Sequence, residues 1–305
     1  MRQLPDPTVF TVRDAEACGW TMSALRNAVR HGRIVRVRQG VYTSVPRRSH
    51  RVDTVAAARN YPDCTVSHRS AALMHDLPLL GAQPTLVEVT VAPRSNANLP
   101  RIHVHRAQLR PPDAVLVDGV AVTSIARTLI DVARHRRLAT AVAAIDAALQ
   151  RGLTTYEELD DVVRSCWNWP GIARARRALH LADHRAESPL ESVSRLVIPR
   201  LGLPAPEPQI TFTDRHGRIV GRGDFYWDEF GVVGEADGRG KYDERPVLTA
   251  EKDRQEELED LGLVAVRWGW RHVQGGQHIL RTKLLNGFER GRRRDRSRFP
   301  RLWTL

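Results

Sequence analysis

The stretch that decides the fold at the N-terminus is residues 21–42, which read TMSALRNAVRHGRIVRVRQGVY. Thr21 can begin a helix, because its hydroxyl can accept a hydrogen bond from a backbone amide of the first turn. Along that helix Met22, Leu25 and Val29 have the i, i+3, i+7 spacing of a buried face. The stretch therefore predicts a short amphipathic helix with these three side chains in a core.

Another face of the same helix is polar. It carries Ser23, Arg26, Asn27 and Arg30, at i, i+3, i+4 and i+7. Residues 11–17 predict a preceding short helix, which Gly19 ends because glycine readily adopts the left-handed conformation found there. Two helices joined by a tight turn form a helix-turn-helix, whose second helix reads base edges in the major groove. We therefore expect the polar face to bind double-stranded DNA.

A basic hairpin follows this helix. Arg36 and Arg38 alternate with valines, and Gln39-Gly40 can turn the chain. A basic hairpin directly after a recognition-type helix is typical of the wing of a winged helix, where arginines contact phosphates or the minor groove. We expect Arg36 and Arg38 to add to the DNA contacts.

The composition of the whole chain agrees with a nucleic-acid partner. Its 47 Lys+Arg against 35 Asp+Glu give a formal net charge of +12, which favours a polyanion. No stretch approaches the roughly 20 apolar residues that span a bilayer, and the N-terminus lacks the apolar segment of a signal peptide. The three cysteines, Cys18, Cys64 and Cys166, are too far apart for a disulfide framework or a zinc site. We expect a cytoplasmic protein with no membrane partner.

Changes in residue pattern predict a multidomain chain of the α+β and α/β classes, since 305 residues exceed what one core usually serves. The expected parts are a winged-helix domain (1–50), a mixed α/β domain (51–182), a third domain (187–289) and a basic tail (290–305). In the middle domain, hydrophobic periodicity predicts strands over 86–91 and 102–105 and helices over 124–134, 138–151 and 155–166.

Histidine pairs in the middle domain raise the question of a metal site. His68 and His75 lie seven residues apart on an expected helix, and His103 and His105 share one face of a strand. Neither pair has carboxylates or cysteines beside it, so we interpret all four as structural histidines. Asp131, among the apolar residues of another helix, is expected to bond to backbone groups or arginines.

The N-terminal and middle parts resemble a known family. Residues 9–45 look like the winged-helix domain of AbiEi-type antitoxins of type IV toxin–antitoxin systems, in the form common in actinobacteria. The matching segments are Arg13-Asp14-Ala15, residues 32–37, Gly40-Val41-Tyr42, residues 67–72 and residues 123–131. The resemblance implies a DNA-binding, often self-repressing regulator. A cognate toxin gene or protein and a second copy of the chain are further candidate partners.

The C-terminal part has another pattern, a helix, three strands, a charged helix, a strand and a last helix. The expected ranges are 188–199, 208–214, 218–227, 231–236, 249–261, 263–268 and 276–289. The order helix–strand–strand–strand–helix–strand is that of the restriction-endonuclease-like core.

Acidic residues in this part form a candidate metal site. If the turn at residues 228–231 is symmetric, opposed residues have numbers that sum to 459, which places Asp224 across from Glu235. Asp237 lies two residues beyond Glu235 and shares its face. Three such carboxylates repel each other unless a divalent cation neutralises them, and oxygen ligands suit Mg²⁺ or Mn²⁺. Such an ion can activate water for attack on a phosphodiester.

Other residues complete this candidate catalytic site. Glu191, in the helix that Ser188-Pro189 opens, can add a fourth carboxylate, and Lys252 or Arg254 can meet a phosphate. Residues 187–273 resemble the PD-(D/E)xK superfamily, particularly its branch related to very-short-patch-repair endonucleases.

This sequence departs from that superfamily at one position. Asp237 stands where the superfamily usually carries its lysine, so Lys241 or Lys252 has to supply that charge if the site is active. Two functions therefore stay open. The first is a DNA-binding protein with a divalent-metal-dependent endonuclease domain. The alternative is a non-catalytic transcriptional regulator or antitoxin whose nuclease fold is degenerate.

Overall fold

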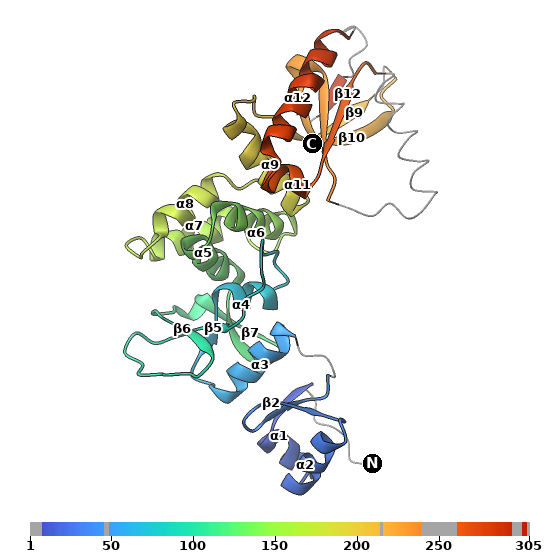
Figure 1. Ribbon diagram of the computed structural model, residues 1–305. Coiled ribbons are helices and arrows are strands. Elements are labelled where there is room, and N and C mark those ends of the chain that lie inside the picture. The colour runs from blue at the N-terminus through green and yellow to red at the C-terminus, as the bar shows by residue number, and fades with distance from the viewer. Residues whose placement is uncertain (1–7, 46–48, 214–215, 239–260, 295–300, 304–305) are drawn as a thin grey trace. The chain divides into compact units, whose positions relative to one another are not determined.

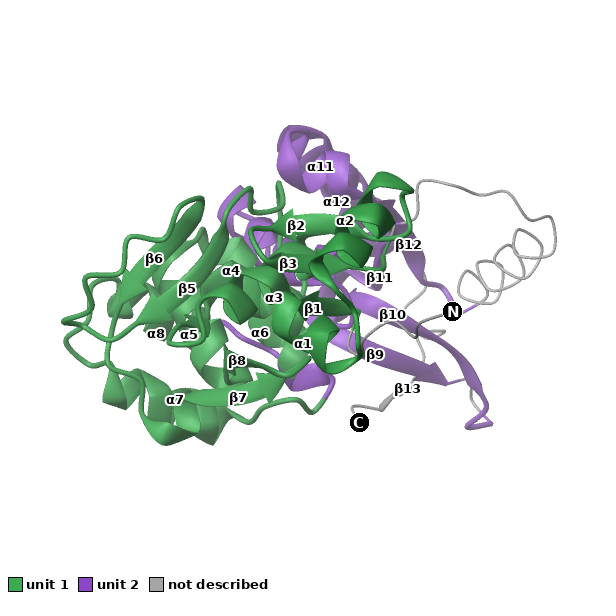
Figure 2. Ribbon diagram, turned by 90° about the horizontal axis from the view of Figure 1, so that it is seen from below, with its two compact units in different colours: residues 1–148, 152–180 green, residues 149–151, 181–305 purple. Residues whose placement is uncertain are grey.

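The computed structural model describes residues 8–45, 49–213, 216–238, 261–294 and 301–303. The chain divides into two compact units (Figure 2). Unit 1 comprises residues 1–148 and 152–180, and unit 2 comprises residues 149–151 and 181–305. The described residues form a mixed α/β protein with three sheets. Within these residues, no helix has the length and apolar character needed to cross a membrane.

Unit 1 begins with a small three-stranded sheet and two short helices (Figure 1). The elements are β1 (Val9–Thr11), α1 (Val12–Ala17), α2 (Met22–Arg30), β2 (Val35–Arg38) and β3 (Val41–Thr43). The sheet order is β1-β3-β2, with both pairs antiparallel. Gly40 turns the chain between β2 and β3 with a φ of 72°, a value that glycine adopts without strain.

The two helices begin where the sequence indicates. Thr11 and Asp14 form a capping box at α1. The Thr21 hydroxyl accepts a hydrogen bond from Ala24 N at the start of α2. The prediction that Met22 belongs to the buried face of α2 was wrong, because Met22 is 40% exposed. Leu25 is fully buried as expected and Val29 is half-buried, while Ala28, and not Met22, is the second fully buried residue of α2.

The rest of unit 1 contains a five-stranded mixed sheet and six helices among its described residues. The elements are α3 (His50–Asn60), β4 (Thr65–Val66), α4 (His68–Met74), β5 (Val87–Val91), β6 (Ile102–Arg106), β7 (Ala114–Val117), β8 (Val120–Thr123), α5 (Ile125–His135), α6 (Leu138–Gln150), α7 (Tyr156–Ser165) and α8 (Ile172–His180). The strand order is β6-β5-β4-β8-β7. The two strands and three helices expected here lie within one residue of their observed ends, whereas α3, β4, β7, β8 and α8 were not anticipated.

One hydrophobic cluster joins the small sheet to α3. Val9 and Val41 of the small sheet pack in it with Val52 and Val55 of α3. Both parts accordingly fall in unit 1. The finer division expected at residue 50 stays a prediction.

Unit 2 is built on a second five-stranded sheet, with α9, α11 and α12 beside it (Figure 1). The elements are α9 (Pro189–Val197), β9 (Glu207–Thr213), β10 (Ile219–Trp227), β11 (Val232–Ala236), β12 (Val264–Trp268), α11 (Trp270–Gln274), α12 (Gln277–Arg292) and β13 (Arg301–Trp303). The strand order is β12-β11-β10-β9-β13, and only the β11–β12 pair is parallel.

The element order of unit 2 agrees with the expected pattern in its described residues. The expected helix over 249–261 lies almost wholly outside them. The expected basic tail is partly structured, because α12 continues to Arg292 and β13 pairs with β9. Whether this unit is a nuclease core stays a prediction.

The register of the β10–β11 hairpin was predicted correctly. Phe225 pairs with Gly234 and Trp227 with Val232, so the numbers of each pair sum to 459. The connection is the short 3-10 helix Asp228–Phe230, followed by Gly231 in the left-handed conformation with a φ of 59°. A connection this short leaves the strands little freedom to slip, so local sequence sets the pairing.

Candidate nucleic-acid interface

The polar face of α2 is the best-formed candidate interface in unit 1. Leu25 and Ala28 are fully buried and fix the rotation of the helix against a core that includes Phe10 and Ile34. That rotation turns the predicted set outward: Ser23, Arg26, Asn27 and Arg30 are all exposed and line one open hollow with Thr21 and Ala24. The four side chains that the sequence spacing assigned to one face of the helix therefore lie together around this hollow.

Polar groups in the hollow are partly ordered by the helix itself. The hydroxyls of Thr21 and Ser23 share a hydrogen bond of 2.9 Å, and Arg26 Nε donates to Met22 O at 3.4 Å. The lining holds two arginines and, among the described residues, no acidic side chain. A positively charged, hydrogen-bonding surface on an exposed helix suits the phosphates and base edges of DNA.

The β2–β3 hairpin carries the two expected wing arginines. Arg36 is exposed and Arg38 is half-buried, and Arg36 Nε donates to Arg38 O at 3.4 Å. The pairing shifts between them, with Arg36 opposite Tyr42 and Arg38 opposite Val41. The hairpin therefore presents Arg36 more openly than Arg38.

The acidic residues of unit 2 are already engaged with protein donors. Asp224 accepts a hydrogen bond from Ala236 N at 2.8 Å, which agrees with a position opposite Glu235. Glu235 is buried and accepts from Arg267 Nε at 2.5 Å. Arg267 therefore places a positive charge beside the Glu235 carboxylate.

Glu191 has a local structural role. Its carboxylate accepts hydrogen bonds from Ser188 Oγ at 2.6 Å, Glu187 N at 2.9 Å and Gln209 Nε2 at 2.8 Å. These bonds tie the start of α9 to β9.

The carboxylates do not present a ready set of metal ligands. Asp237 is half-buried, and Lys241 and Lys252 lie outside the described residues. Across the part of the chain that the structure describes, the one group of three potential donors within 4.8 Å of one another is made of histidines. The Mg²⁺ or Mn²⁺ site, and the catalytic roles of these acids and lysines, stay predictions.

The histidines of unit 1 behave in two ways. His75 is satisfied as expected, because its Nε2 hydrogen-bonds to Thr123 O at 2.8 Å. His68 and His105 instead gather with His135, a residue that the sequence pattern did not single out. The three lie on different elements and are 30 or more residues apart, so spacing gave no signal.

Comparisons with known proteins bear on the N-terminal elements. The family described as "Transcriptional regulator, AbiEi antitoxin" matches residues 7–45, which include β1 to β3 and the polar face of α2. This region is thus similar to a family of regulators.

Two relatives come from Mycobacterium tuberculosis. The uncharacterized proteins MT2308 and Rv2248, from strains CDC 1551 and H37Rv, are each 35% identical to the chain over 150 residues, 49% of this chain. The chain spans 55% of each relative's length. A crystal structure of the RV2827C protein of the same organism aligns with a TM-score of 0.40 and 18% identity, over 57% of this chain and 72% of that chain.

Proposed function

We propose that this chain is a DNA-binding transcriptional regulator of the antitoxin type, which contacts duplex DNA through α2 and the β2–β3 hairpin. The observation that carries the proposal is the exposed set Ser23, Arg26, Asn27 and Arg30 around one hollow. The family match over residues 7–45 supports it, because it covers the same elements.

The proposed binding mode is that of a winged helix. In this mode α2 lies in the major groove, where arginine and asparagine can form bidentate hydrogen bonds with guanine and adenine. Arg36 on the hairpin contacts the backbone or the minor groove. A cognate toxin gene, a toxin protein and a second copy of the chain are further proposed partners.

The experiment measures binding of the full chain to a DNA duplex selected from a random library, by fluorescence anisotropy at several salt concentrations. The Arg26→Ala/Arg30→Ala variant is expected to bind at least about 30-fold more weakly, because each specific arginine contact contributes about 1–3 kcal/mol. The slope of log K against log salt should also fall by about 1 for each arginine–phosphate interaction that the variant removes.

The matched control is Arg176→Ala/Arg177→Ala, which removes two exposed arginines of α8 in the same unit. This control changes the net charge equally and should bind within a few-fold of the unaltered chain. Equal weakening in both variants would mean that net charge alone, and not the α2 face, drives binding, and the proposal would be abandoned.

A divalent-metal-dependent nuclease is the second proposed function. The observation in its favour is the hairpin register, in which Phe225 pairs with Gly234, the residues adjacent to Asp224 and Glu235. Plasmid cleavage with Mg²⁺ or Mn²⁺ tests it. Cleavage that the Asp224→Ala/Glu235→Ala variant abolishes, while the exposed-acid control Glu157→Ala/Asp160→Ala retains it, would support a nuclease. If the chain binds DNA but does not cleave it, the nuclease proposal fails and the regulator remains as the proposed function.

A further inference from the structure

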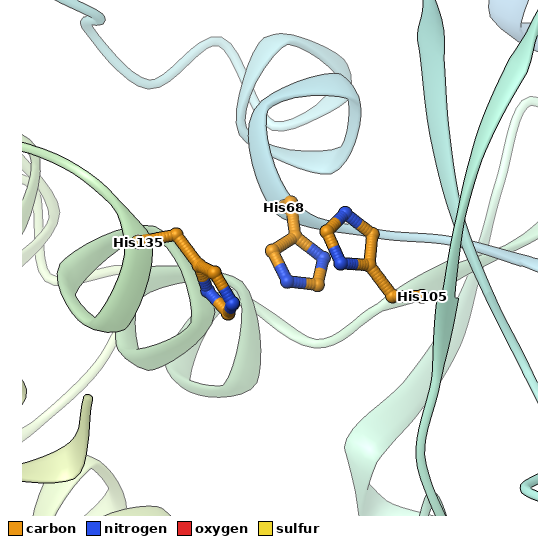
Figure 3. Close-up of side chains that lie close together, drawn as sticks. All are labelled: His68, His105 and His135. Atoms are coloured by element: carbon orange, nitrogen blue, oxygen red, sulfur yellow. The ribbon is translucent and has the colours of Figure 1, made fainter. Parts of the chain in front are cut away.

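Three histidine rings from separate elements of unit 1 lie side by side (Figure 3). His68 begins α4, His105 lies on β6 and His135 ends α5. One ligand nitrogen from each ring lies within 4.8 Å of the other two. The rings of His68 and His105 are stacked, with centroids 3.5 Å apart.

Two of these rings have an unsatisfied buried nitrogen. Nε2 of His68 and Nε2 of His105 are both buried and have no hydrogen-bond partner. Leaving such a group without a partner is energetically unfavourable. Burial lowers the pKa of both rings, that of His105 to about 4.

The other ring nitrogens are held by neighbouring groups. His135 Nδ1 lies 2.9 Å from Asp131 O, and since a carbonyl only accepts, this nitrogen carries the proton. His68 Nδ1 lies 2.9 Å from the Ser67 hydroxyl. The bond to Asp131 O leaves Nε2 of His135 as its ligand atom, an arrangement common among metal-binding histidines.

The backbone at His68 is strained. Its φ is 53°, in the left-handed region that non-glycine residues rarely adopt. Such conformations are unfavourable for residues other than glycine and cluster at functional sites. Glycine at this position would relieve the strain but would remove the imidazole.

The surroundings allow a cation to enter. A cavity of about 500 Å³ is lined by all three histidines, and the exposed fraction increases from buried His68 through half-buried His105 to exposed His135. The nearby guanidinium groups of Arg127 and Arg134 are each ion-paired with Asp131 at 2.8 Å. Both arginines nevertheless act on the His68 ring, whose pKa their positive charge lowers further.

We propose that His68, His105 and His135 bind one divalent transition-metal ion of the Zn²⁺ class through their Nε2 atoms. Neutral imidazoles suit Zn²⁺, and three protein ligands leave a fourth position open toward the cavity. Bonds of about 2.0–2.1 Å require the rings to turn toward a common centre, and the exposed position of His135 leaves that ring room to do so. The site lies outside the proposed DNA-binding elements, so it does not depend on that function.

The test uses the full chain after dialysis against a chelator. Titration with Co²⁺, monitored by visible absorption, is expected to saturate at one ion per chain with the intense bands of a tetrahedral site, and Zn²⁺ should displace the Co²⁺. Because removing a group that only supports a ligand already costs 10–100-fold in metal affinity, His105→Ala and His135→Ala should each weaken binding by at least about 100-fold.

Two control variants define the site. His103→Ala removes a ring that stacks on His105 but is not one of the three, and His278→Ala removes an exposed histidine of unit 2. Both should bind Co²⁺ as the unaltered chain does. Circular dichroism checks the fold, and the exposed position of His135 keeps that variant informative if His105→Ala is poorly folded.

Three results would overturn the proposal. The first is saturation only at millimolar metal. The second is a Co²⁺ affinity that neither His105→Ala nor His135→Ala changes. The third is a loss of Co²⁺ affinity in the two control variants as large as that in His105→Ala and His135→Ala. Calorimetric binding of inorganic phosphate by the metal-free chain, with no binding of metal, would instead identify an anion pocket formed by the arginines.

Discussion

Buried charges in unit 1 are paired both within one helix and between elements. Asp113 is 1% exposed and accepts hydrogen bonds from Arg110 N at 2.9 Å and from Arg127 at 3.1 Å. Arg127 also pairs with Asp131 at 2.8 Å, as the sequence pattern predicted for that aspartate. Replacing both partners of such a pair with apolar residues changes the free energy of unfolding little, but removing one partner leaves a buried charge uncompensated.

The Asp113→Asn variant tests this residue. Burial by itself would raise the pKa of Asp113, but hydrogen bonds from Arg110 and the charge of Arg127 outweigh it and hold the pKa below the usual 3.8. The ionised carboxylate therefore contributes stability that is fully present above about pH 4 and is lost as the pH falls through the folded-state pKa. The variant should be about 3 kcal/mol less stable at pH 7.

Urea unfolding at pH 7, 5, 4 and 3, monitored for unit 1, measures the difference in unfolding free energy between the unaltered chain and the Asp113→Asn variant. The difference should be constant between pH 7 and 5 and should shrink below pH 4. Asp160→Asn is the control, because Asp160 pairs with Arg164 on the exposed surface of α7 and should change stability by less than about 1 kcal/mol. A difference independent of pH down to pH 3 would contradict the assigned pKa direction.

At the scale of elements, α12 is positioned by two glycines four residues apart. A Cβ at Gly287 would lie 2.6 Å from Val266 Cγ2 on β12. A Cβ at Gly291 would collide with the carbonyl oxygen of Phe230, at the β10–β11 connection. The helix therefore lies close to the sheet only because these two positions have no side chain.

The Gly291→Ala variant tests this close approach. Alanine favours a helix by about 1 kcal/mol over glycine, but overpacking against a backbone carbonyl costs about 1–3 kcal/mol or more. We expect net destabilisation of unit 2 by about 1–2 kcal/mol, measured as a lower unfolding midpoint. Asn286→Ala, on the exposed face of the same helix, should leave the midpoint unchanged or raise it slightly. A raised midpoint for Gly291→Ala would refute the close approach.

At the scale of the molecule, the chain is two compact units with separate cores. Two cores need not unfold together, so thermal unfolding is expected in two steps. Differential scanning calorimetry should show that Asp131→Asn lowers only one transition temperature and Gly291→Ala only the other. Asp131 lies in unit 1 and Gly291 in unit 2. A single transition that both variants shift would mean that the units unfold as one.

The sequence determined much of this protein by itself. The periodicities over residues 124–151 and 208–236 predicted their helices and strands, because alternation and 3.6-residue spacing are local properties of the chain. The polar face of α2 followed from spacing for the same reason. The pairing of Phe225 with Gly234 followed because a short turn fixes the register of its two strands.

The tertiary structure alone decided which distant side chains meet. Sequence patterns grouped His68 with His75, whereas folding brings His68 to His105 and His135. They gave no sign that Arg267, on the parallel neighbour β12, pairs with Glu235. Local patterns encode the periodicity of each element, but contacts between elements depend on how their apolar faces pack, and that packing involves residues far apart in the chain.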